Sequence, residues 1–486
     1  MRNFILCYIN GERHQIDAKN AFMTVAEYLR YIKGLTGTKI VCSEGDCGAC
    51  TILLSRMIDG KMTSYKSINS CISFMYLLDR CHIVTVEGLK VKGHLHEVQE
   101  KMVEHHGAQC GYCTPGFICA MANMAEDLKI NQKQNSEQKI KNYLTGNLCR
   151  CTGYEPIIKA GLGIELEKVE LLSSVYSDGK MATDFLDNAM NSVLIKKAET
   201  SVFLPNQMRE VVDFKTKNPE SKLVSGATDI GVLNNKGRLE LVNILSLNNV
   251  NEAYKVLEFD DRFEIGAKVS LDSVEKALKK SFPEFSRKLH IFASPQIKNK
   301  GTLVGNLVNA SPIGDTIPFL ILAGVEVELV SSSKVRTLPI SKFIKKGYKN
   351  LDIKENEFIS KIILPKTKDE FKLYKVSTRK DLDISTVTMA CRYHLKGTKI
   401  EHLEVAFGGV GPSVLKMRKI EKFAKDKKFN QVLFKDLAEK VEDEISPMSD
   451  HRGSVQFRHI LCKNLMLKFC DDVMVENGMD FKRSSI

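Results

Sequence analysis

The chain has 486 residues, of which 43% are hydrophobic and 27% are charged, and its formal net charge is +12. This composition is typical of a globular protein with about three domains. It argues against a membrane span, because the most apolar stretch, residues 317–330, is interrupted by a proline, a glycine and two glutamates. Basic residues are interspersed with acidic ones, which favours a lysine-rich solvated surface over a nucleic-acid-binding face. We therefore expect a cytoplasmic protein with neither a membrane anchor nor a nucleic-acid partner.

The first residues predict a hairpin followed by a helix. An apolar run at residues 4–9 is followed by Asn10-Gly11 and by a second strand-like stretch that ends at Ile16, which is a hairpin pattern. Thr24 and Glu27 have the spacing of a capping box before residues at helical spacing. Hairpin, helix and then a cysteine-rich loop is the order of a β-grasp ferredoxin.

Four cysteines in this region have the plant-type ferredoxin spacing, with a four-residue gap, a two-residue gap and a distant fourth thiol. A [2Fe–2S] core needs two thiolates at each of two irons, so four is the required number. Gly45 and Gly48 let the loop bend around the cluster and point N–H groups at its sulfurs. Structural zinc is the alternative, but three thiols within nine residues fit a cluster better. The predicted ligands are Cys42, Cys47, Cys50 and Cys71.

A second four-cysteine set follows in a region that predicts helices. We expect one helix around Val98 and Met102, a second that opens at Thr114, and a third over residues 137–144. Two of the thiols would then lie at a helix N-terminus, where the helix dipole stabilises an oxidised cluster of charge −2. Zinc remains an alternative for this pair-plus-pair spacing. The predicted ligands are Cys110, Cys113, Cys149 and Cys151.

The other six cysteines are scattered, and we expect them to be small core residues, without disulfides. They are Cys7, Cys81, Cys119, Cys391, Cys462 and Cys470.

The sequence around both sets resembles the molybdenum hydroxylase family, which includes xanthine dehydrogenase, aldehyde oxidoreductase and aerobic carbon monoxide dehydrogenase. The similar runs are Gly-Ala-Gln-Cys-Gly-Tyr-Cys-Thr-Pro-Gly-Phe at residues 107–117, Gly-Asn-Leu-Cys-Arg-Cys-Thr-Gly-Tyr at 146–154 and Gly-Asp-Cys-Gly-Ala-Cys-Thr at 45–51. Ile40 and Val41 depart from the family pattern, which has an acidic residue and a glycine before the first ligand. A β-branched residue tolerates positive φ poorly. Either the loop does not need that conformation, or the surroundings of the cluster are altered.

Residues 166–198 have few periodic signals and are expected to form a linker, after which short strands and helices alternate. The glycine fingerprint of a Rossmann fold is absent. Two small-residue loops appear instead, at residues 223–230 and 301–315, and their backbones could approach a pyrophosphate closely. Ordinary turns would explain either loop alone about as well. The first loop comprises Leu223, Val224, Ser225, Gly226, Ala227, Thr228, Asp229 and Ile230.

Together, the two loops resemble the flavin domain of the same family, which shares the vanillyl-alcohol oxidase fold. The resemblance implies that Phe292 lies against the isoalloxazine ring and that a basic residue, Lys416, lies near the flavin. The C-terminal motifs, such as Gly-Gly-Val-Gly-Pro at residues 408–412, continue the match. The residues implied to hold the pyrophosphate, ribose and adenine are Thr302, Gly305, Asn306 and Asp315.

The resemblance implies an α+β multidomain chain. Its expected parts are a β-grasp [2Fe–2S] ferredoxin-type domain at 1–87, a helical [2Fe–2S] domain at 88–165, the linker at 166–198, an FAD-binding domain at 199–370 and a C-terminal α+β flavoprotein domain at 371–486.

The order of these parts resembles the small subunit of bacterial xanthine dehydrogenases. It implies that electrons pass from a molybdopterin-binding large subunit through two [2Fe–2S] clusters to FAD and on to NAD⁺ during purine oxidation. Bound cofactors would carry the chemistry, without a further catalytic side chain in this chain, and the assembly would be a heterotetramer or larger. The alternatives are the corresponding subunit of a hydroxylase for aldehydes, N-heterocycles or aromatic thioesters, and a non-catalytic scaffold stabilised by zinc.

Overall fold

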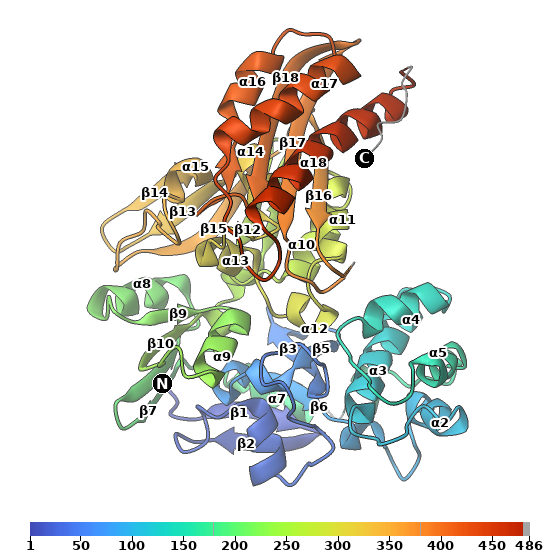
Figure 1. Cartoon of the computed structure of the whole chain (residues 1–486). Helices are drawn as coiled ribbons and strands as arrows, with labels where there is room; N and C mark the ends of the chain where they lie inside the picture. The colour runs from blue at the N-terminus through green and yellow to red at the C-terminus, as the bar shows by residue number, and fades with distance from the viewer. Residues whose placement is uncertain (178, 380, 480–486) are drawn as a thin grey trace. The chain divides into compact units, whose positions relative to one another are not determined.

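The computed structural model describes residues 1–177, 179–379 and 381–479, and the chain forms two compact units (Figure 1). The first unit comprises Met1–Ala253 and Ala293–Gly301, and the second comprises Tyr254–Phe292 and Thr302–Ile486. Across the described residues, no helix combines the length and the apolar character that crossing a bilayer requires.

The first unit begins with a β-grasp sheet of strand order β2-β1-β6-β3-β4, in which β5 also pairs with β3. The predicted hairpin is confirmed: β1 and β2 are antiparallel, and Asn10 and Gly11 have φ values of 50° and 85°. The predicted capping box of Thr24 and Glu27 is also confirmed. The elements are β1 (Ile5–Ile9), β2 (Glu12–Ile16), α1 (Val25–Glu27), η1 (Tyr28–Ile32), β3 (Thr51–Ile58), β4 (Lys61–Met62), β5 (Lys66–Asn69), η2 (Ser70–Ile72), η3 (Met75–Leu78), β6 (Cys81–Val84) and η4 (Glu87–Leu89).

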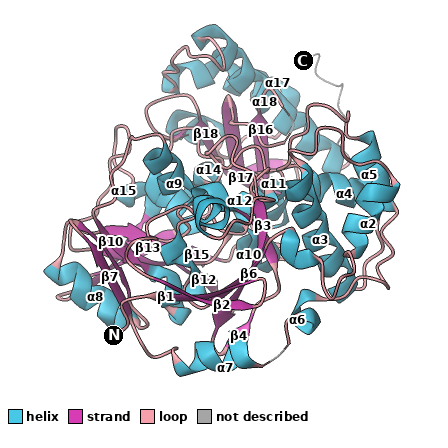
Figure 2. Cartoon of the chain, turned by 90° about the horizontal axis from the view of Figure 1, so that it is seen from below, coloured by secondary structure: helices cyan, strands magenta, loops and turns pink. Residues whose placement is uncertain are grey.

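Strand β1 is buried on both faces, which explains its unbroken apolar sequence. Ile5 and Ile9 face the main core of the unit. Leu6 and Tyr8 face the other way and pack around Phe185 of α7 (Lys180–Asp187). Figure 2 shows this helix near β4. The segment 166–198, expected to be a linker, thus supplies a helix that covers this sheet, and it also contains α6 (Leu172–Val175) and β7 (Val193–Lys197).

Four helices follow the sheet, and the three that were expected lie where the sequence predicted them. Val98 and Met102 are buried as one face of α2, whereas Val103 is exposed. The long helix α3 is surrounded by its neighbours, with Phe117 and Met121 fully buried. The helices are α2 (Glu97–Glu104), α3 (Thr114–Ile130), α4 (Glu137–Leu144) and α5 (Glu155–Leu162).

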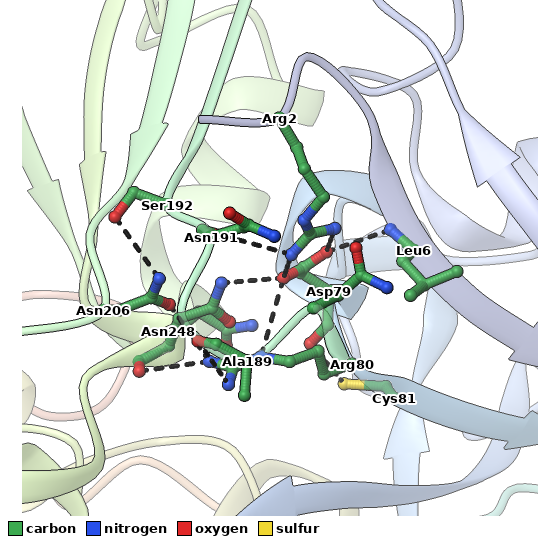
Figure 3. Close-up of polar contacts among 12 residues, drawn as sticks. Arg2, Leu6, Asp79, Arg80, Cys81, Ala189, Asn191, Ser192, Asn206 and Asn248 are labelled. Atoms are coloured by element: carbon green, nitrogen blue, oxygen red, sulfur yellow. Dashed lines mark hydrogen bonds and ion pairs between the residues drawn. The ribbon is translucent and has the colours of Figure 1, made fainter. Parts of the chain in front are cut away.

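A second sheet of order β7-β8-β10-β9 completes the first unit. Arg2 joins it to the β-grasp sheet: its backbone pairs with Val193 of β7, and its guanidinium forms a buried ion pair with Asp79 at an N–O distance of 2.8 Å (Figure 3). Asp79 also accepts a hydrogen bond from Asn249, and Arg80 donates one to the carbonyl of Asn249. The elements are β8 (Thr200–Leu204), α8 (Met208–Lys217), β9 (Lys222–Val224), α9 (Thr228–Asn235), β10 (Asn243–Ser246), η5 (Leu247–Asn249), η6 (Asn251–Tyr254) and α12 (Pro295–Lys298).

The second unit contains two antiparallel sheets, of order β11-β12-β15-β13-β14 and β16-β17-β18-β19. Residues of α16, α17 and α18 form one apolar core with β17 and β18. The elements are β11 (Val256–Glu258), β12 (Arg262–Gly266), α10 (Leu271–Leu278), α11 (Pro283–His290), α13 (Leu303–Asn309), α14 (Ile317–Leu322), β13 (Glu326–Val330), β14 (Val335–Pro339), α15 (Ile340–Phe343), β15 (Phe358–Pro365), β16 (Glu370–Val376), β17 (Val387–Lys396), β18 (Lys399–Gly408), β19 (Leu415–Lys416), α16 (Arg418–Ala424), α17 (Gln431–Lys440), η7 (Val441–Glu444) and α18 (Val455–Glu476).

Candidate functional site

The first four-cysteine set lies in the loop that leads into β3 and on η2. The Cys42 thiol is within hydrogen-bonding range of the Cys47 and Cys71 thiols. The Cys50 thiol is within the same range of Cys71. The structure therefore brings together all four thiols that the spacing singled out.

The electrostatics of this set favour two of its four sulfurs, those of Cys42 and Cys50, as anions. Hydrogen bonds from the Cys47 and Cys71 thiols hold the pKa of Cys42 far below its usual range, and the same bonds raise the pKa of both donors. The backbone N–H of Glu44 also donates to Cys42 Sγ, at 3.5 Å. Thiolates are the form that iron requires.

The loop around this set has left-handed backbone at Ser43, Gly45 and Gly48, with φ values of 54°, 75° and 69°. Positive φ at Gly45 and Gly48 agrees with the bend that the sequence predicted. Ile40 and Val41 are outside the left-handed region, so their departure from the family pattern imposes no backbone strain. Ile40 instead packs against the buried cysteines of the set, and the Val41 side chain is exposed.

The second four-cysteine set joins the start of α3 to the loop before α5. The Cys151 thiol lies 3.6 Å from Cys110 Sγ and 3.9 Å from Cys149 Sγ, and Cys149 is also in hydrogen-bonding range of Cys113. Although burial opposes the shift, hydrogen bonds from Thr152 help to lower the pKa of Cys149 to about 7. Cys110 and Cys151 are exposed.

In each set, contacts between thiols link all four sulfurs into one group. A [2Fe–2S] core takes two thiolates at each of two irons, so the number and the chemistry of both donor sets fit such a cluster. All six other cysteines are buried, as the sequence predicted.

A short backbone connection links the two sets. Leu148, the residue before Cys149, donates its N–H to the carbonyl oxygen of Cys47 at 3.0 Å. The α3 backbone also lies against the first loop, because a Cβ on Gly116 would be only 2.2 Å from the carbonyl oxygen of Gly48. One hydrogen bond thus joins the backbone of a predicted ligand of the first cluster to the residue that precedes a predicted ligand of the second.

The short helix α12 reinforces this connection, and it lies beside β5 (Figure 1). The side chain of Gln296 is buried and donates to Asn147 Oδ1 at 2.8 Å and to Thr51 Oγ1 at 3.2 Å. Asn147 in turn donates to the carbonyl oxygen of Gly48 at 3.1 Å. Residues from three distant parts of the sequence therefore meet in one polar cluster beside both thiol sets.

The first small-residue loop connects β9 to α9 in the first unit. Ala227 has a φ of 62° and precedes the helix, which begins at Thr228. A Cβ on Gly226 would lie 2.2 Å from the carbonyl oxygen of Lys300, so this glycine is required by contact with the chain itself. The N–H groups of the first turn of α9 have no helical partner, which is compatible with an anionic ligand.

The second small-residue loop lies in the second unit and surrounds α13. Thr302 caps this helix by accepting the N–H of Gly305 at 3.0 Å. Asn306 Oδ1 accepts the hydroxyl of Thr316 at 2.5 Å. The structure thus links three of the four predicted residues of this loop to local hydrogen bonds.

Asp315, the fourth, is buried and already paired. Lys375 Nζ lies 2.7 Å from its carboxylate, and the Ser385 hydroxyl donates to it at 2.5 Å.

The other two residues that the resemblance placed near the flavin lie outside the second small-residue loop. Phe292 follows α11 in the sequence and is half-buried. Lys416, on β19, forms ion pairs with Glu404 and Glu421. No contact joins Lys416 to Thr302, Asn306 or Asp315 within the described residues.

A buried lysine near Asp315 was not anticipated from the sequence. Lys288 on α11 is 6% exposed, and within the described residues its ammonium has no hydrogen bond or ion pair. Burial lowers the pKa of Lys288 to about 8, although Asp315 opposes the shift and Lys375 adds to it. An unpaired cation in this position suits an anionic ligand. This unit therefore contains a feature that fits a dinucleotide.

Four family models match the chain in succession. Residues 7–76 match a 2Fe-2S iron-sulfur cluster binding domain, and residues 85–162 match a [2Fe-2S] binding domain. Residues 197–367 match the FAD binding domain in molybdopterin dehydrogenase, and residues 372–473 match the CO dehydrogenase flavoprotein C-terminal domain. The chain belongs to the molybdenum hydroxylase family, as its iron–sulfur and flavin part. Both cysteine-rich regions match [2Fe–2S]-binding domains, which favours iron–sulfur clusters over zinc for both thiol sets. The third model adds an FAD-binding domain.

Curated relatives support this assignment. Xanthine dehydrogenase 1 of Arabidopsis thaliana is 30% identical over 540 aligned positions, which cover 96% of this chain and 39% of the relative. Xanthine dehydrogenase/oxidase of Rattus norvegicus is 28% identical and covers 98% of this chain, again with 39% of the relative. The chain thus spans about two-fifths of the length of the molybdenum hydroxylases that it matches.

Solved structures support the fold. Quinoline 2-oxidoreductase from Pseudomonas putida 86 matches with a TM-score of 0.54 and 21% identity, over 58% of this chain and 100% of that chain. Carbon monoxide dehydrogenase from Hydrogenophaga pseudoflava matches with a TM-score of 0.53 and 19% identity, over 56% of this chain and 96% of that chain.

Sequence reasoning missed the polar side chains that surround the predicted ligands. Asn147 lies inside one of the runs that resemble the family, and Gln296 follows Phe292 by four residues, but nothing in their spacing showed that they would meet. Asn235 and Lys288 lay outside every motif. A buried polar residue on an otherwise apolar helix face was the one available signal, and it applies to Lys288.

Proposed function

We propose that this chain is the electron-transfer subunit of a xanthine dehydrogenase. It passes electrons from a partner molybdopterin-binding subunit through two [2Fe–2S] clusters to FAD and on to NAD⁺ in the oxidation of hypoxanthine or xanthine. The observation that carries this proposal is the pair of four-thiol sets joined by the Leu148–Cys47 hydrogen bond. In this proposal the chain assembles with the molybdopterin-binding subunit into a heterotetramer or a larger heteromer.

Each part of the chain has a defined task in this proposal. The cysteines of the first set hold one cluster, and those of the second set hold the other; their thiolates anchor the irons at fixed separation. When bound, the clusters carry single electrons, and the flavin exchanges two electrons with NAD⁺. Exposed Cys110 and Cys151 place the second cluster near the surface, where a partner subunit delivers electrons.

The composition of the purified chain tests the cofactors. We expect about four irons, four acid-labile sulfides and one FAD per chain after anaerobic purification, with two distinct EPR signals on reduction. Zinc in place of iron, or a colourless protein, would contradict the proposal.

The reaction itself is tested with and without a partner. The isolated chain should transfer electrons from NADH to an artificial dye but should not oxidise xanthine. Addition of the molybdopterin-binding chain should produce xanthine-dependent reduction of NAD⁺. Turnover of an aldehyde or an N-heterocycle instead of xanthine would assign the chain to a different molybdenum hydroxylase.

The flavin residues in the second unit are tested with Lys288. Replacement of Gly305 by valine is ambiguous, because a Cβ there would lie 2.8 Å from Thr302 Oγ1 and disturb the helix cap. Lys288→Gln removes only the buried charge, and we expect FAD affinity to fall about tenfold or more. Arg287→Gln is the matched control, because Arg287 is the preceding residue and its side chain is 70% exposed. Equal FAD affinity in both variants would show that Lys288 does not contact the dinucleotide.

A further inference from the structure

The C-terminal end of α9 contacts the first four-thiol set. Asn235, the last residue of the helix, donates through its side-chain amide to the carbonyl oxygen of Cys71 at 2.8 Å. The same nitrogen donates to the carbonyl oxygen of Ser43 at 2.9 Å. Ser43 follows Cys42, so one amide group joins the two chain segments that carry the first and the last thiol of the set.

The hydrogen bond to Ser43 holds a backbone conformation that is unfavourable on its own. Ser43 has a φ of 54°, in the left-handed region that costs a non-glycine residue energy. Such a conformation persists only where neighbouring groups determine it. Asn235 supplies this determination, because its N–H group fixes the direction of the Ser43 carbonyl.

Other contacts hold the same helix against the same loop. Lys236, directly after α9, forms an ion pair with Glu44. Gly231, inside α9, lies so close to η2 that a Cβ would be 2.4 Å from the carbonyl oxygen of Ile72. Val232 of α9 packs among Cys50, Cys71 and Ile72. The helix is therefore fixed to the first set along its second half.

The other end of α9 begins at the first flavin loop. The helix has eight residues, which corresponds to about 12 Å at a rise of 1.5 Å per residue. One rigid element therefore has the loop at residues 223–230 at its start and the thiol set at its end. A displacement of the loop by a ligand moves the hydrogen-bond donors of Asn235 relative to Ser43 and Cys71.

We propose that Asn235 is a positioning residue of the first iron–sulfur site, and that through it α9 couples the occupancy of the flavin loop to that site. This inference rests on the proposed function, because it requires a cluster on the first cysteines and FAD at the loop. Asn235 contacts the backbone of the ligand loop and acts on the cluster through it.

The inference predicts a change confined to one cluster. Loss of the amide frees the Ser43 and Cys71 carbonyls, so the ligand loop relaxes and the thiolates change direction. It also removes N–H dipoles whose positive ends lie near the cluster, and this makes the cluster harder to reduce. We expect altered g-values and a more negative midpoint potential for the first cluster, and unchanged values for the second.

The test uses Asn235→Ala in the full chain with bound cofactors, and Asn234→Ala is the matched control. Both asparagines line the same cavity of about 300 Å³ beside Cys71, so both substitutions enlarge it, but only Asn235 donates to the ligand loop. Cys71→Ser and Cys151→Ser assign the two EPR signals. Asn235→Gln, which keeps a donor, should return the g-values and midpoint potential of the first cluster part of the way to those of the parent.

Redox titration monitored by EPR gives the readout. A shift of the first signal in Asn235→Ala, absent in Asn234→Ala, supports the positioning role, as does selective loss of the first cluster with the second intact. First-cluster g-values and potential equal to the parent would overturn it. A parent protein without iron would instead refute the proposed function.

Removal of FAD tests the coupling. In the parent chain, removal of FAD should shift the first EPR signal and leave the second unchanged, and in Asn235→Ala this response should be smaller. An identical first signal with and without FAD in the parent would overturn the coupling through α9. A parent chain that never binds FAD would instead contradict the flavin assignment.

Discussion

The two four-thiol sets have equal numbers of thiols but differ in burial: each set has two half-buried thiols, and the other two are buried in the first set and exposed in the second. In the first set, Cys50 and Cys71 are each 2% exposed and are enclosed by η2, α9 and the apolar side chain of Ile297. In the second set, Cys110 and Cys151 are exposed, and the loop that carries Cys151 is open to solvent. The exposed set suits an exchange with another molecule, whereas the buried set suits a fixed potential inside the chain.

The domains that carry the two sets are also stabilised by different chemistry. The β-grasp domain is joined to the second sheet of its unit through Arg2, whose backbone pairs with Val193 of β7 and whose guanidinium forms a buried ion pair with Asp79 (Figure 3). In the helical domain, the buried carboxyl group of Glu126 accepts the N–H of Leu172 at 2.5 Å and so holds α6 against α3. An ion pair and a single buried acid respond differently to substitution and to pH.

Loss of one ligand from each set should produce the largest difference. Cys151→Ser should remove one EPR signal, abolish flavin reduction by the partner and its substrate, and leave reduction of FAD by NADH intact. Cys50→Ser should remove the other signal with the same effect on flow from the partner. Stopped-flow absorbance measures both directions. If Cys151→Ser retained FAD but NADH could no longer reduce it, the order of the relay would be wrong.

Removal of the buried carboxylate in the β-grasp domain should cost much of its stability. Asp79→Ala leaves the guanidinium groups of Arg2 and Arg80 buried without a counter-charge, and we expect a loss of about 3–5 kcal/mol in the free energy of unfolding. Arg13→Ala, which breaks the exposed pair with Asp184, should cost less than about 1 kcal/mol. Anaerobic urea unfolding measures both values, and similar losses would show that burial of the pair is unimportant.

The helical domain should respond to pH near neutrality. Burial raises the pKa of Glu126 to about 7, although the Leu172 N–H and Lys66 oppose the shift. Because the folded pKa is above that of the unfolded chain, the contribution is complete below pH ~4.5 and is lost as pH rises through 7, by up to about 3 kcal/mol. Glu126→Gln should remove this dependence.

Hydrogen exchange of α3 amides, corrected for intrinsic rates between pH 5 and 8, measures the effect of Glu126. The same pH dependence in the parent and in Glu126→Gln would assign it to other titratable groups; Tyr65, which faces the carboxyl, stays protonated in this range because burial raises its pKa.

The smallest expected effect is on the rate of iron loss. A chelator should remove the second cluster at least about tenfold faster than the first, because its exposed thiols need no opening of the structure. The decay of the two EPR signals under anaerobic conditions measures the ratio. Equal rates would show that both sites open together and that the difference in burial has no kinetic consequence.

The sequence predicted the local features well. The hairpin, the capping box and the helix at residues 137–144 depend on residues within a few positions of each other, and all three are confirmed. The gathering of each thiol set was also predictable, because cluster chemistry fixes the number and type of ligands. The role of each thiol as a ligand stays a prediction.

Contacts between distant residues could not be predicted. Residues 180–187 have no signal that distinguishes a linker from a helix over a sheet, because Phe185 is buried only once β1 is in place. Gln296 and Asn235 contact residues more than 140 positions away in the sequence. Such pairs are set by the packing of whole elements, which a single sequence does not encode in its spacing.

The segment at residues 293–301 has a consequence for synthesis of the chain. It belongs to the first unit, although about forty residues of the second unit precede it. At about 5–20 residues per second, a ribosome reaches Gln296 several seconds after residue 253. Until then the buried Asn147 Oδ1 lacks the donor that Gln296 supplies, so the emerging electron-transfer unit passes through an incomplete state. A polypeptide that ended at residue 253 would keep this defect permanently, and a workable truncation must retain α12.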